Sequence, residues 1–318
     1  MIDKIESEII KNWKGDEKIP LVSICCITYN HEKFISEALD SFLMQVTDFP
    51  FEIIVRDDAS LDNTRNIIEK YYKRFPKIIK PILEEENTYS KGVKPFKETT
   101  NLAIGKYIAL CEGDDYWTDN KKLQIQADIL EKNSIYSSVA HQAVVLDGEE
   151  SKDFSHSVKT DYVLDDLIFE RKFHTASLVF RRDILKKYPL PSNVLSGDKM
   201  LILLLALCGK IRFINKRMCV YRKHEGGISS WVNMGMMKQD INMVSWLTSI
   251  DKNFPKYKLL SFIHRTILIH SSSITLKGLC IHTYYFICYS FSYFPRNIKN
   301  IAGFFLRDIA LLIRKINS

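Results

Sequence analysis

Apolar runs and amphipathic stretches alternate along the first 130 residues of this 318-residue chain. Residues 22–27 (VSICCI) are almost wholly apolar and partly β-branched, which predicts a strand covered on both faces. Residues 34–43 place apolar side chains at i, i+3, i+4 and i+7, which predicts a helix with one buried stripe. The same alternation then recurs, with strands predicted over 51–55, 78–83 and 107–110 and helices over 63–72, 94–103 and 121–130. Such an alternation predicts βαβ units around a parallel sheet.

The pattern beyond residue 130 is mixed. It predicts a strand over 177–180, a largely buried helix over 197–207, and two short strands over 211–214 and 218–221. Glycine and polar residues follow in 224–230 (HEGGISS), and from about residue 231 the pattern is helical to the end. We therefore predict an α/β domain over 1–230, with halves over about 21–132 and 133–230, and a helical extension over 231–318.

Acidic side chains gather at the ends of the predicted strands. Asp57 and Asp58 follow the second strand, and Glu112, Asp114 and Asp115 follow the fourth. Ligands of open parallel sheets bind at the carboxyl ends of the strands. Like charges this close raise one another's pKa, so we expect a cation or a hydrogen-bond donor to be shared between them. For any one acid alone, a solvated helix cap is the alternative.

Charge and cysteine content exclude several classes of protein. The formal net charge is +7, but residues 252–318 carry ten Lys or Arg and one acid, which leaves the rest of the chain nearly neutral. That distribution argues against a nucleic-acid groove over the whole protein. Seven cysteines without a Cys-x-x-Cys pair form neither a disulfide framework nor a zinc site, which favours a reducing cytosol. The first 20 residues lack the apolar core of a signal peptide.

Five stretches together resemble the family 2 glycosyltransferases with the GT-A fold. They are VSICCITYNHEKFISEALDSFLMQ, EIIVRDDASLDNT, GKYIALCEGDDYW, SGDKMLILLLALCGK and YRKHEGGIS, in the family's order, and they span most of residues 21–230. The resemblance implies a Rossmann-like, mostly parallel sheet flanked by helices, with a C-terminal helical extension. It also implies an inverting, non-processive transferase with a nucleotide-diphosphate sugar as donor.

The resemblance implies a donor site at the carboxyl ends of the first strands. Tyr29 would offer its ring to the base, and Asp57 or Asp58 would accept hydrogen bonds from base or ribose, with the choice between them open. The segment after His224 would close over the diphosphate, with Arg222 adding a charge-assisted contact. The implied donor contacts are Thr28, Tyr29, Asn30, Asp57, Asp58, Glu112, Asp114, Arg222, Ser229 and Ser230.

The sequence Glu112-Gly113-Asp114 stands where the family has Asp-X-Asp. The resemblance implies a divalent ion, Mn²⁺ or Mg²⁺, bound by Asp114, with Asp115 and His224 as further ligands. Glu112 has a longer side chain and would reach the sugar or the ion through water.

The family's general base corresponds to Asp198, at the start of the predicted helix over 197–207. It would take the proton of the attacking acceptor hydroxyl. A helix-capping role is the alternative, and the two roles can coexist. His174 is expected to be structural or to face the acceptor.

These implications together predict a metal-dependent glycosyltransferase. It would move a sugar, with UDP as the favoured nucleotide, to a hydroxyl of a glycan or lipid-linked acceptor in bacterial cell-surface polysaccharide synthesis. The alternative is a non-catalytic nucleotide- or sugar-binding protein on the same fold. A dehydrogenase is disfavoured because ITYNHEKF contains no glycine, and a processive synthase because Gln-x-x-Arg-Trp and several clear spanning helices are missing from the sequence.

The extension over 231–318 is basic and aromatic. Residues 278–295 carry no charged side chain, and seven aromatics lie between Tyr284 and Phe294. Residues 298–316 form an amphipathic pattern. Aromatic and cationic residues suit a membrane interface, so we predict a cytoplasmic protein with a peripheral contact to the inner face of the plasma membrane. A helical subdomain packed on the catalytic body, or a homodimer contact, is the alternative.

Overall fold

The structure is a computed structural model of the whole chain, and it describes residues 4–156, 159–224, 234–270 and 276–293. The strands are β1 (Val22–Thr28), β2 (Phe51–Asp57), β3 (Ile79–Leu83), β4 (Tyr107–Leu110), β5 (Tyr116–Trp117), β6 (Tyr136–Asp147), β7 (Glu150–Asp153), β8 (Asp161–Tyr162), β9 (Val179–Arg181) and β10 (Lys210–Lys223). The helices are α1 (Glu6–Ile10), α2 (Ile35–Leu43), α3 (Thr64–Arg74), α4 (Pro95–Leu102), α5 (Lys122–Lys132), α6 (Leu164–Leu167), α7 (Arg182–Lys187), α8 (Gly197–Cys208), α9 (Met234–Met237), α10 (Ile241–Ile250), α11 (Lys256–His270) and α12 (Leu276–Tyr293). Short 3₁₀ turns are η1 (Tyr89–Lys91), η2 (Thr175–Ser177) and η4 (Lys238–Asp240).

The described strands form one mixed sheet in the order β3-β2-β1-β4-β9-β6-β10-β5, with β7 beside β6 and β8 beside β10. Strands β3, β2, β1 and β4 are mutually parallel, as predicted. In this register Thr28, the last residue of β1, lies opposite Asp57. The carboxyl ends of the first strands therefore meet at one edge, which brings the predicted acidic residues together.

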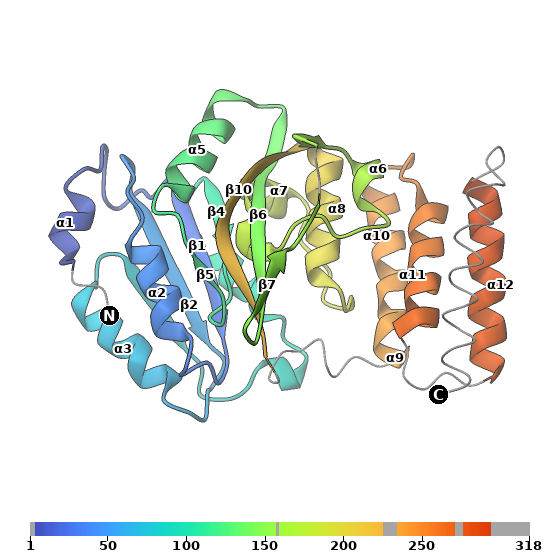
Figure 1. Cartoon of the computed structure of the whole chain (residues 1–318), viewed down its shortest axis with the longest axis horizontal. Coiled ribbons are helices and arrows are strands. Elements are labelled where there is room, and N and C mark those ends of the chain that lie inside the picture. Colours follow the sequence, from blue (N-terminus) through green and yellow to red (C-terminus); the bar gives the residue numbers. More distant parts are fainter. Residues whose placement is uncertain (1–3, 157–158, 225–233, 271–275, 294–318) are drawn as a thin grey trace. The chain divides into compact units, whose positions relative to one another are not determined.

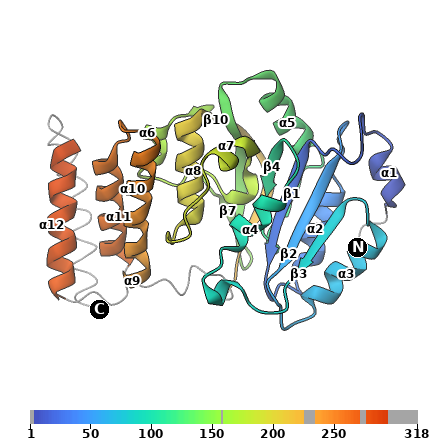
Figure 2. The ribbon, with the colours of Figure 1, turned by 180° about the vertical axis from the view of Figure 1, so that it is seen from behind.

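Helices cover both faces of the parallel part. Crossovers between parallel strands are right-handed, so the connections β1–α2–β2–α3–β3, which run outward, place both helices on one face. The connection through α4 returns from β3 to β4 and lies on the other face. Figure 1 presents the face with α2 and α3, and Figure 2 presents the face with α4. The predicted stripe of α2 is buried against the sheet (Ile35, Ala38, Leu39, Phe42 and Leu43).

Three strand predictions in the second half of the sheet were wrong in detail. The two short strands predicted over 211–214 and 218–221 are one strand, β10, which shifts register between Ile214 and Cys219 while it stays paired with β6. Such a bulge lets extra residues loop out without ending the strand. The strand predicted over 177–180 begins as the turn η2 and continues as β9, which is antiparallel to β4 and β6.

The longest unpredicted element is β6, in the middle of the sheet. Its sequence, YSSVAHQAVVLD, breaks the apolar pattern with Ser137, Ser138, His141 and Gln142, all of which are buried. Gln142 compensates for its burial by hydrogen bonds to the backbone of Ala143 and Ser155. A strand that buries polar side chains with their hydrogen bonds satisfied has no continuous apolar run in its sequence, and for this reason β6 was not predicted.

The chain divides into two compact units. The first comprises Met1–Leu164, Arg171–Ser192 and Leu205–His224, and therefore contains the whole sheet. The second comprises Asp165–Glu170, Asn193–Leu204 and Glu225–Ser318. The boundary predicted at residue 230 and the amphipathic stretch predicted over 298–316 lie outside the described residues.

Helices dominate the described part of the second unit. Helices α11 and α12 pack along each other and share buried polar contacts: Ser261 Oγ lies 2.8 Å from Ser290 Oγ, and His264 Nδ1 lies 2.8 Å from His282 Nδ1. Among the described helices, we find none with the length and apolar character needed to cross a membrane.

Candidate active site

The acidic turn after β4 is pressed against the end of β1. The Cys111 N–H donates to the Cys25 carbonyl at 3.3 Å, and the Gly113 N–H donates to the Ile27 carbonyl at 2.9 Å. A Cβ atom at Gly113 would lie only 2.6 Å from Thr28 Oγ1 and 2.7 Å from Thr28 Cβ. Glycine is therefore required between Glu112 and Asp114, because any side chain would push the turn away from β1.

Three side chains that can bind metal converge at this turn. Asp114 Oδ2 lies 2.9 Å from His224 Nε2 and 3.8 Å from His31 Nε2. One ligand atom from each of the three residues lies within 4.8 Å of the other two. The three come from the turn after β4, from the end of β10 and from the loop after β1, which meet at the carboxyl edge of the sheet. We call them the His31–Asp114–His224 cluster.

Arg222, at the end of β10, fixes the turn. Its backbone N–H donates to Asp115 Oδ1 at 2.9 Å, and its Nη1 donates to the Asp114 carbonyl oxygen at 2.7 Å. The guanidinium also pairs with Glu37 and lies 4.2 Å from the centre of the Tyr116 ring. The side chain is therefore used in contacts within the protein, and its predicted contact with the donor stays a prediction.

Asp115 faces the interior and belongs to a different group. It is fully buried, and its Oδ2 lies 3.5 Å from Nδ1 of His174, a ring stacked on Tyr221 at 4.1 Å. Glu112 is the third member of this group. Burial, with Asp114 and Glu112 close by, raises the pKa of Asp115 well above its usual value. The structure therefore separates Asp115 from the His31–Asp114–His224 cluster, and a metal contact for it stays a prediction.

The His31–Asp114–His224 cluster fits a divalent ion. Asp114 Oδ1 is buried and has no hydrogen-bond partner among the described residues, which is costly unless a cation or donor compensates. Burial lowers the pKa of His31, so its imidazole is neutral at pH 7 and can act as a ligand. Asp114 and His224 were predicted as ligands; His31 was missed. The signal that could have found it is a histidine directly after Tyr29-Asn30, at the carboxyl end of the first strand.

The carboxylates of Asp57 and Asp58 both accept hydrogen bonds from neighbouring loops. Asp57 accepts hydrogen bonds from Ser60 N, at 3.2 Å, and from Ser60 Oγ. Burial raises its pKa although these bonds oppose the shift. Asp58 accepts from Thr88 N and Tyr89 N, each at 2.9 Å, and from Thr88 Oγ1. Both aspartates therefore shape the loops around the predicted base site, and direct contact with a nucleotide stays a prediction for each.

The residues after β1 differ in accessibility. Tyr29 is 39% exposed, as a base-stacking ring requires, whereas the Thr28 side chain is buried under Gly113. Asn30 adopts a left-handed backbone conformation with φ of 55°, and its Oδ1 accepts from the Leu61 N–H at 2.7 Å. The predicted donor contacts Ser229 and Ser230 lie outside the described residues.

Asp198 lies in the first turn of α8, as predicted, and is partly exposed. It belongs to the second compact unit. Its neighbour Ser196 is held by Asp240, whose Oδ1 accepts from Ser196 N at 2.8 Å and whose Oδ2 accepts from Ser196 Oγ at 2.6 Å. Its role as a general base stays a prediction.

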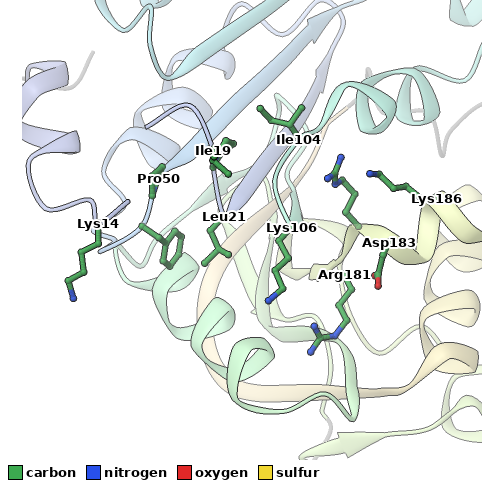
Figure 3. A pocket seen from close by; sticks show the side chains of 12 residues that line it. Lys14, Ile19, Leu21, Pro50, Ile104, Lys106, Arg181, Asp183 and Lys186 are labelled. Atoms are coloured by element: carbon green, nitrogen blue, oxygen red, sulfur yellow. The ribbon is translucent and has the colours of Figure 1, made fainter. Parts of the chain in front are cut away.

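A hollow of about 570 Å³ lies at the opposite edge of the sheet (Figure 3). Leu21, Pro50 and Lys106, which line it, immediately precede β1, β2 and β4 and therefore mark the amino ends of these strands. No residue of the acidic turn lines this hollow. The His31–Asp114–His224 cluster and this hollow are thus separate features.

Comparison with known proteins agrees with the geometry. The model of the family described as "Glycosyl transferase family 2" matches residues 23–189, more than half of the chain. The chain belongs to this family. The glucosyltransferase WfgD of Escherichia coli, named UDP-Glc:alpha-D-GlcNAc-diphosphoundecaprenol beta-1,3-glucosyltransferase, is 36% identical over 116 residues, which cover 37% of this chain and 43% of WfgD.

Relatives from mycobacteria are 40% identical over 212 residues, which cover 65% of this chain. The matched region spans 60% of the length of those relatives.

Comparison with solved structures confirms the GT-A fold. Staphylococcus aureus TarS 1–349, solved with UDP-GlcNAc, superposes with a TM-score of 0.67 at 23% identity, covering 84% of this chain and 81% of the solved TarS 1–349 chain. The mannosyltransferase PcManGT of Pyrobaculum calidifontis, solved with GDP-Man and Mn²⁺, superposes with a TM-score of 0.54 at 16% identity, covering 96% and 86% of the two chains. The predicted GT-A fold, with a sheet flanked by helices and with C-terminal helices, is therefore confirmed.

Proposed function

We propose that this family 2 protein is a metal-dependent, inverting glycosyltransferase that uses a UDP-sugar and acts on a glycan or lipid-linked acceptor. The observation that carries the proposal is the convergence of Asp114 and His224, 2.9 Å apart, at the carboxyl edge of the sheet where Tyr29 is exposed. Ligands of open α/β sheets bind at this edge. A base-stacking ring beside a metal-binding carboxylate suits a nucleotide diphosphate.

In this proposal a divalent ion, Mn²⁺ or Mg²⁺, would be held by Asp114 and His224, with Asp115 as a further candidate. The ion would supply positive charge that stabilises the departing diphosphate. PcManGT, which was solved with Mn²⁺, supports this part of the proposal. Buried Asp115 and Arg222 would keep the turn in place, through the bonds that join Arg222 to Asp115 Oδ1 and to the Asp114 carbonyl.

The donor would bind with its base against Tyr29. Asp57 and Asp58 would hold the surrounding loops and provide acceptors for base or ribose. Thr28, Asn30, Glu112, Ser229 and Ser230 complete the proposed donor site. TarS, solved with UDP-GlcNAc, and WfgD, named for UDP-Glc, support UDP as the nucleotide.

Asp198 is the proposed general base. Its carboxylate would accept the proton of the acceptor hydroxyl while that oxygen forms a bond to the anomeric carbon, on the face opposite the diphosphate. The bond from the anomeric carbon to the diphosphate oxygen breaks in the same step, so the configuration inverts. The proton then resides on Asp198, and the nucleoside diphosphate leaves with the electron pair of the broken bond.

The acceptor is proposed to belong to bacterial cell-surface polysaccharide synthesis. The name of WfgD specifies a sugar on diphosphoundecaprenol, which is a lipid-linked acceptor. Such an acceptor is presented at the inner face of the plasma membrane, where we propose that the protein acts in the cytoplasm. Peripheral membrane contact through the C-terminal extension and homodimer formation are further parts of the proposal.

The test is a screen of UDP- and GDP-sugars with the full chain, in which nucleotide release is measured with Mn²⁺, with Mg²⁺ and with a chelator. Metal-dependent release from one donor is expected. Asp198→Asn should retain donor binding and lose transfer to an acceptor. If donors bind but no nucleotide is released, with or without glycan and lipid-linked acceptors, the protein is the alternative, a binding module on this fold.

A further inference from the structure

The imidazole of His31 shares the site with Asp114 and His224, although it lies in a different loop from either. We propose that His31 is a third protein ligand and that the resulting two-histidine, one-carboxylate centre selects a first-row transition ion such as Mn²⁺ over Mg²⁺. This inference rests on the proposed function, because that proposal puts a divalent ion at Asp114 and His224.

The positions of the three side chains support a shared ion. His31 Nε2 and His224 Nε2 both point at the same carboxylate oxygen, Asp114 Oδ2, from 3.8 Å and 2.9 Å. Their rings meet edge to face, with centroids 5.9 Å apart. All three side chains are mostly buried but open to solvent, with exposed fractions of 15% to 20%. Three protein ligands would leave further positions on the ion open for diphosphate oxygens and water.

His31 is held in place by a network between two loops. Its backbone N–H donates to Thr64 Oγ1 at 2.9 Å, and Thr64 Oγ1 in turn donates to Asp62 Oδ1 at 2.5 Å. The preceding residue, Asn30, donates its N–H to Ser60 Oγ at 2.8 Å. The following residue, Glu32, donates its N–H to Asp62 Oδ2 at 3.0 Å.

Two more bonds close this network. The Leu61 N–H donates to Asn30 Oδ1 at 2.7 Å, and the Asn63 N–H donates to Glu32 Oε2 at 3.0 Å. Each of the three residues 30–32 is thus bonded to residues 60–64, which form the end of the loop after β2 and the first residue of α3. A ligand residue on a loop fixed in this way loses little conformational entropy when it binds an ion.

The chemistry of the ligands favours a transition ion. Mg²⁺ prefers carboxylate oxygens and retained waters, and it gains little from imidazole nitrogen. Mn²⁺, Co²⁺ and Zn²⁺ accept imidazole, and a set of two histidines and one carboxylate with open positions is typical of transition-ion centres. If only His224 joined Asp114, the protein would offer the ion one nitrogen and one oxygen. With His31 as well, two of the three protein ligands would be nitrogens. Such a ligand set would bind Mg²⁺ less tightly than a transition ion.

The direct test uses the full chain, freed of metal by a chelator and loaded with Mn²⁺ in the absence of nucleotide. Pulsed electron paramagnetic resonance detects the nitrogen nuclei of imidazoles bound to Mn²⁺. Couplings from two imidazoles are expected. Coupling from one imidazole, or from none, would overturn the inference. This measurement needs no substitution and no activity.

Substitution adds a second test. His31→Gln should weaken Mn²⁺ binding by about tenfold or more and Mg²⁺ binding much less, so that the ratio of the two affinities falls. His156→Gln, which changes an exposed histidine, is the matched control and should bind both ions as the wild type does. Circular dichroism verifies that each variant is folded.

The outcomes separate this inference from the proposed function. If Asp114→Asn and His224→Gln lose Mn²⁺ while His31→Gln retains wild-type affinity for both ions, the inference fails and the proposed metal site stands. If Asp114→Asn binds Mn²⁺ as the wild type does, the proposed metal site fails as well.

Discussion

The imidazole Nε2 of His224 lies 2.9 Å from Oδ2 of Asp114, although 110 residues separate the two along the chain. The contact exists because β10 ends beside the turn that follows β4. Arg222 secures that arrangement with one backbone and one side-chain hydrogen bond to Asp115 and Asp114. Any change that loosens the turn should therefore displace the proposed metal ligands, even where it removes none of them.

Replacing Asp114 by Asn should abolish metal-dependent release of nucleotide from the donor, by at least about a hundredfold. The amide keeps the shape of the side chain but removes the negative charge that an ion requires. Release of nucleotide over time, at saturating donor and Mn²⁺, is the measurement. Asp183→Asn makes the same chemical change at an exposed position that lines the hollow at the other edge of the sheet, and it serves as the control. Activity of the Asp114 variant close to that of the control would contradict the role assigned to Asp114.

Replacing Tyr29 by Ala should weaken UDP binding by about tenfold, because a base–aromatic stack contributes about 1–3 kcal/mol. Tyr29→Phe retains the ring and should bind UDP as the wild type does. Calorimetric titration of each variant with UDP in the presence of Mn²⁺ gives the dissociation constants. Equal affinity for the Ala and Phe variants would show that the exposed ring does not contact the base.

Gly113→Ala should destabilise the protein and weaken Mn²⁺ binding together. The new Cβ would meet Thr28 Oγ1 at 2.6 Å and Thr28 Cβ at 2.7 Å, so the turn carrying Asp114 must move. Overpacking of this kind costs about 1–3 kcal/mol. Urea unfolding and Mn²⁺ titration measure the two effects.

The matched control for stability is Gly197→Ala, at a helical position where a Cβ meets no atom within 4 Å. It should leave the urea midpoint unchanged or raise it. A Gly113 variant that unfolds at the same urea concentration as this control would show that the turn has room to adjust.

Lys122→Met should stabilise the protein most at pH 7 and below. Lys122 is fully buried, with Nζ 4.0 Å from the centre of the Trp117 ring, and burial lowers its pKa to about 7 from an ordinary value of 10.5. Between pH 7 and pH 10.5, Lys122 carries a proton in the unfolded chain but not in the folded chain. The free energy of unfolding of the wild type therefore rises with pH in this range. Below about pH 7 the cost of burying the charge is present in full.

The expected result is a difference in unfolding free energy, variant minus wild type, that is positive at pH 7.5 and falls by about 1.4 kcal/mol per pH unit toward pH 9. Urea unfolding of both proteins at several pH values measures it. Ionisation of the cysteines in the unfolded chain affects both proteins equally and cancels in the difference. A difference independent of pH would mean that Lys122 keeps its proton in the folded protein.

The sequence by itself predicted the parallel half of the sheet and its helices. The apolar run of β1 and the stripe of α2 are local signals, because a strand or helix that buries a face must carry apolar side chains at the matching period. The sequence pattern did not reveal β6, because buried His141 and Gln142 interrupt the apolar run of this strand. Whether such a polar residue is tolerated depends on hydrogen-bond partners contributed by other segments, such as Ser155 for Gln142.

The sequence also located the acidic turn and, through the order of its motifs, the family. Only the tertiary structure distinguished the two adjacent aspartates. Asp114 remains partly open beside two histidines, while Asp115 is buried against Arg222 and His174. Burial and ligand distances depend on segments far apart in the chain that pack at one edge of the sheet. Local pattern carries no record of that packing. The sequence shows a histidine directly after Tyr29-Asn30, but only the folded chain shows that His31 lies beside Asp114 and His224.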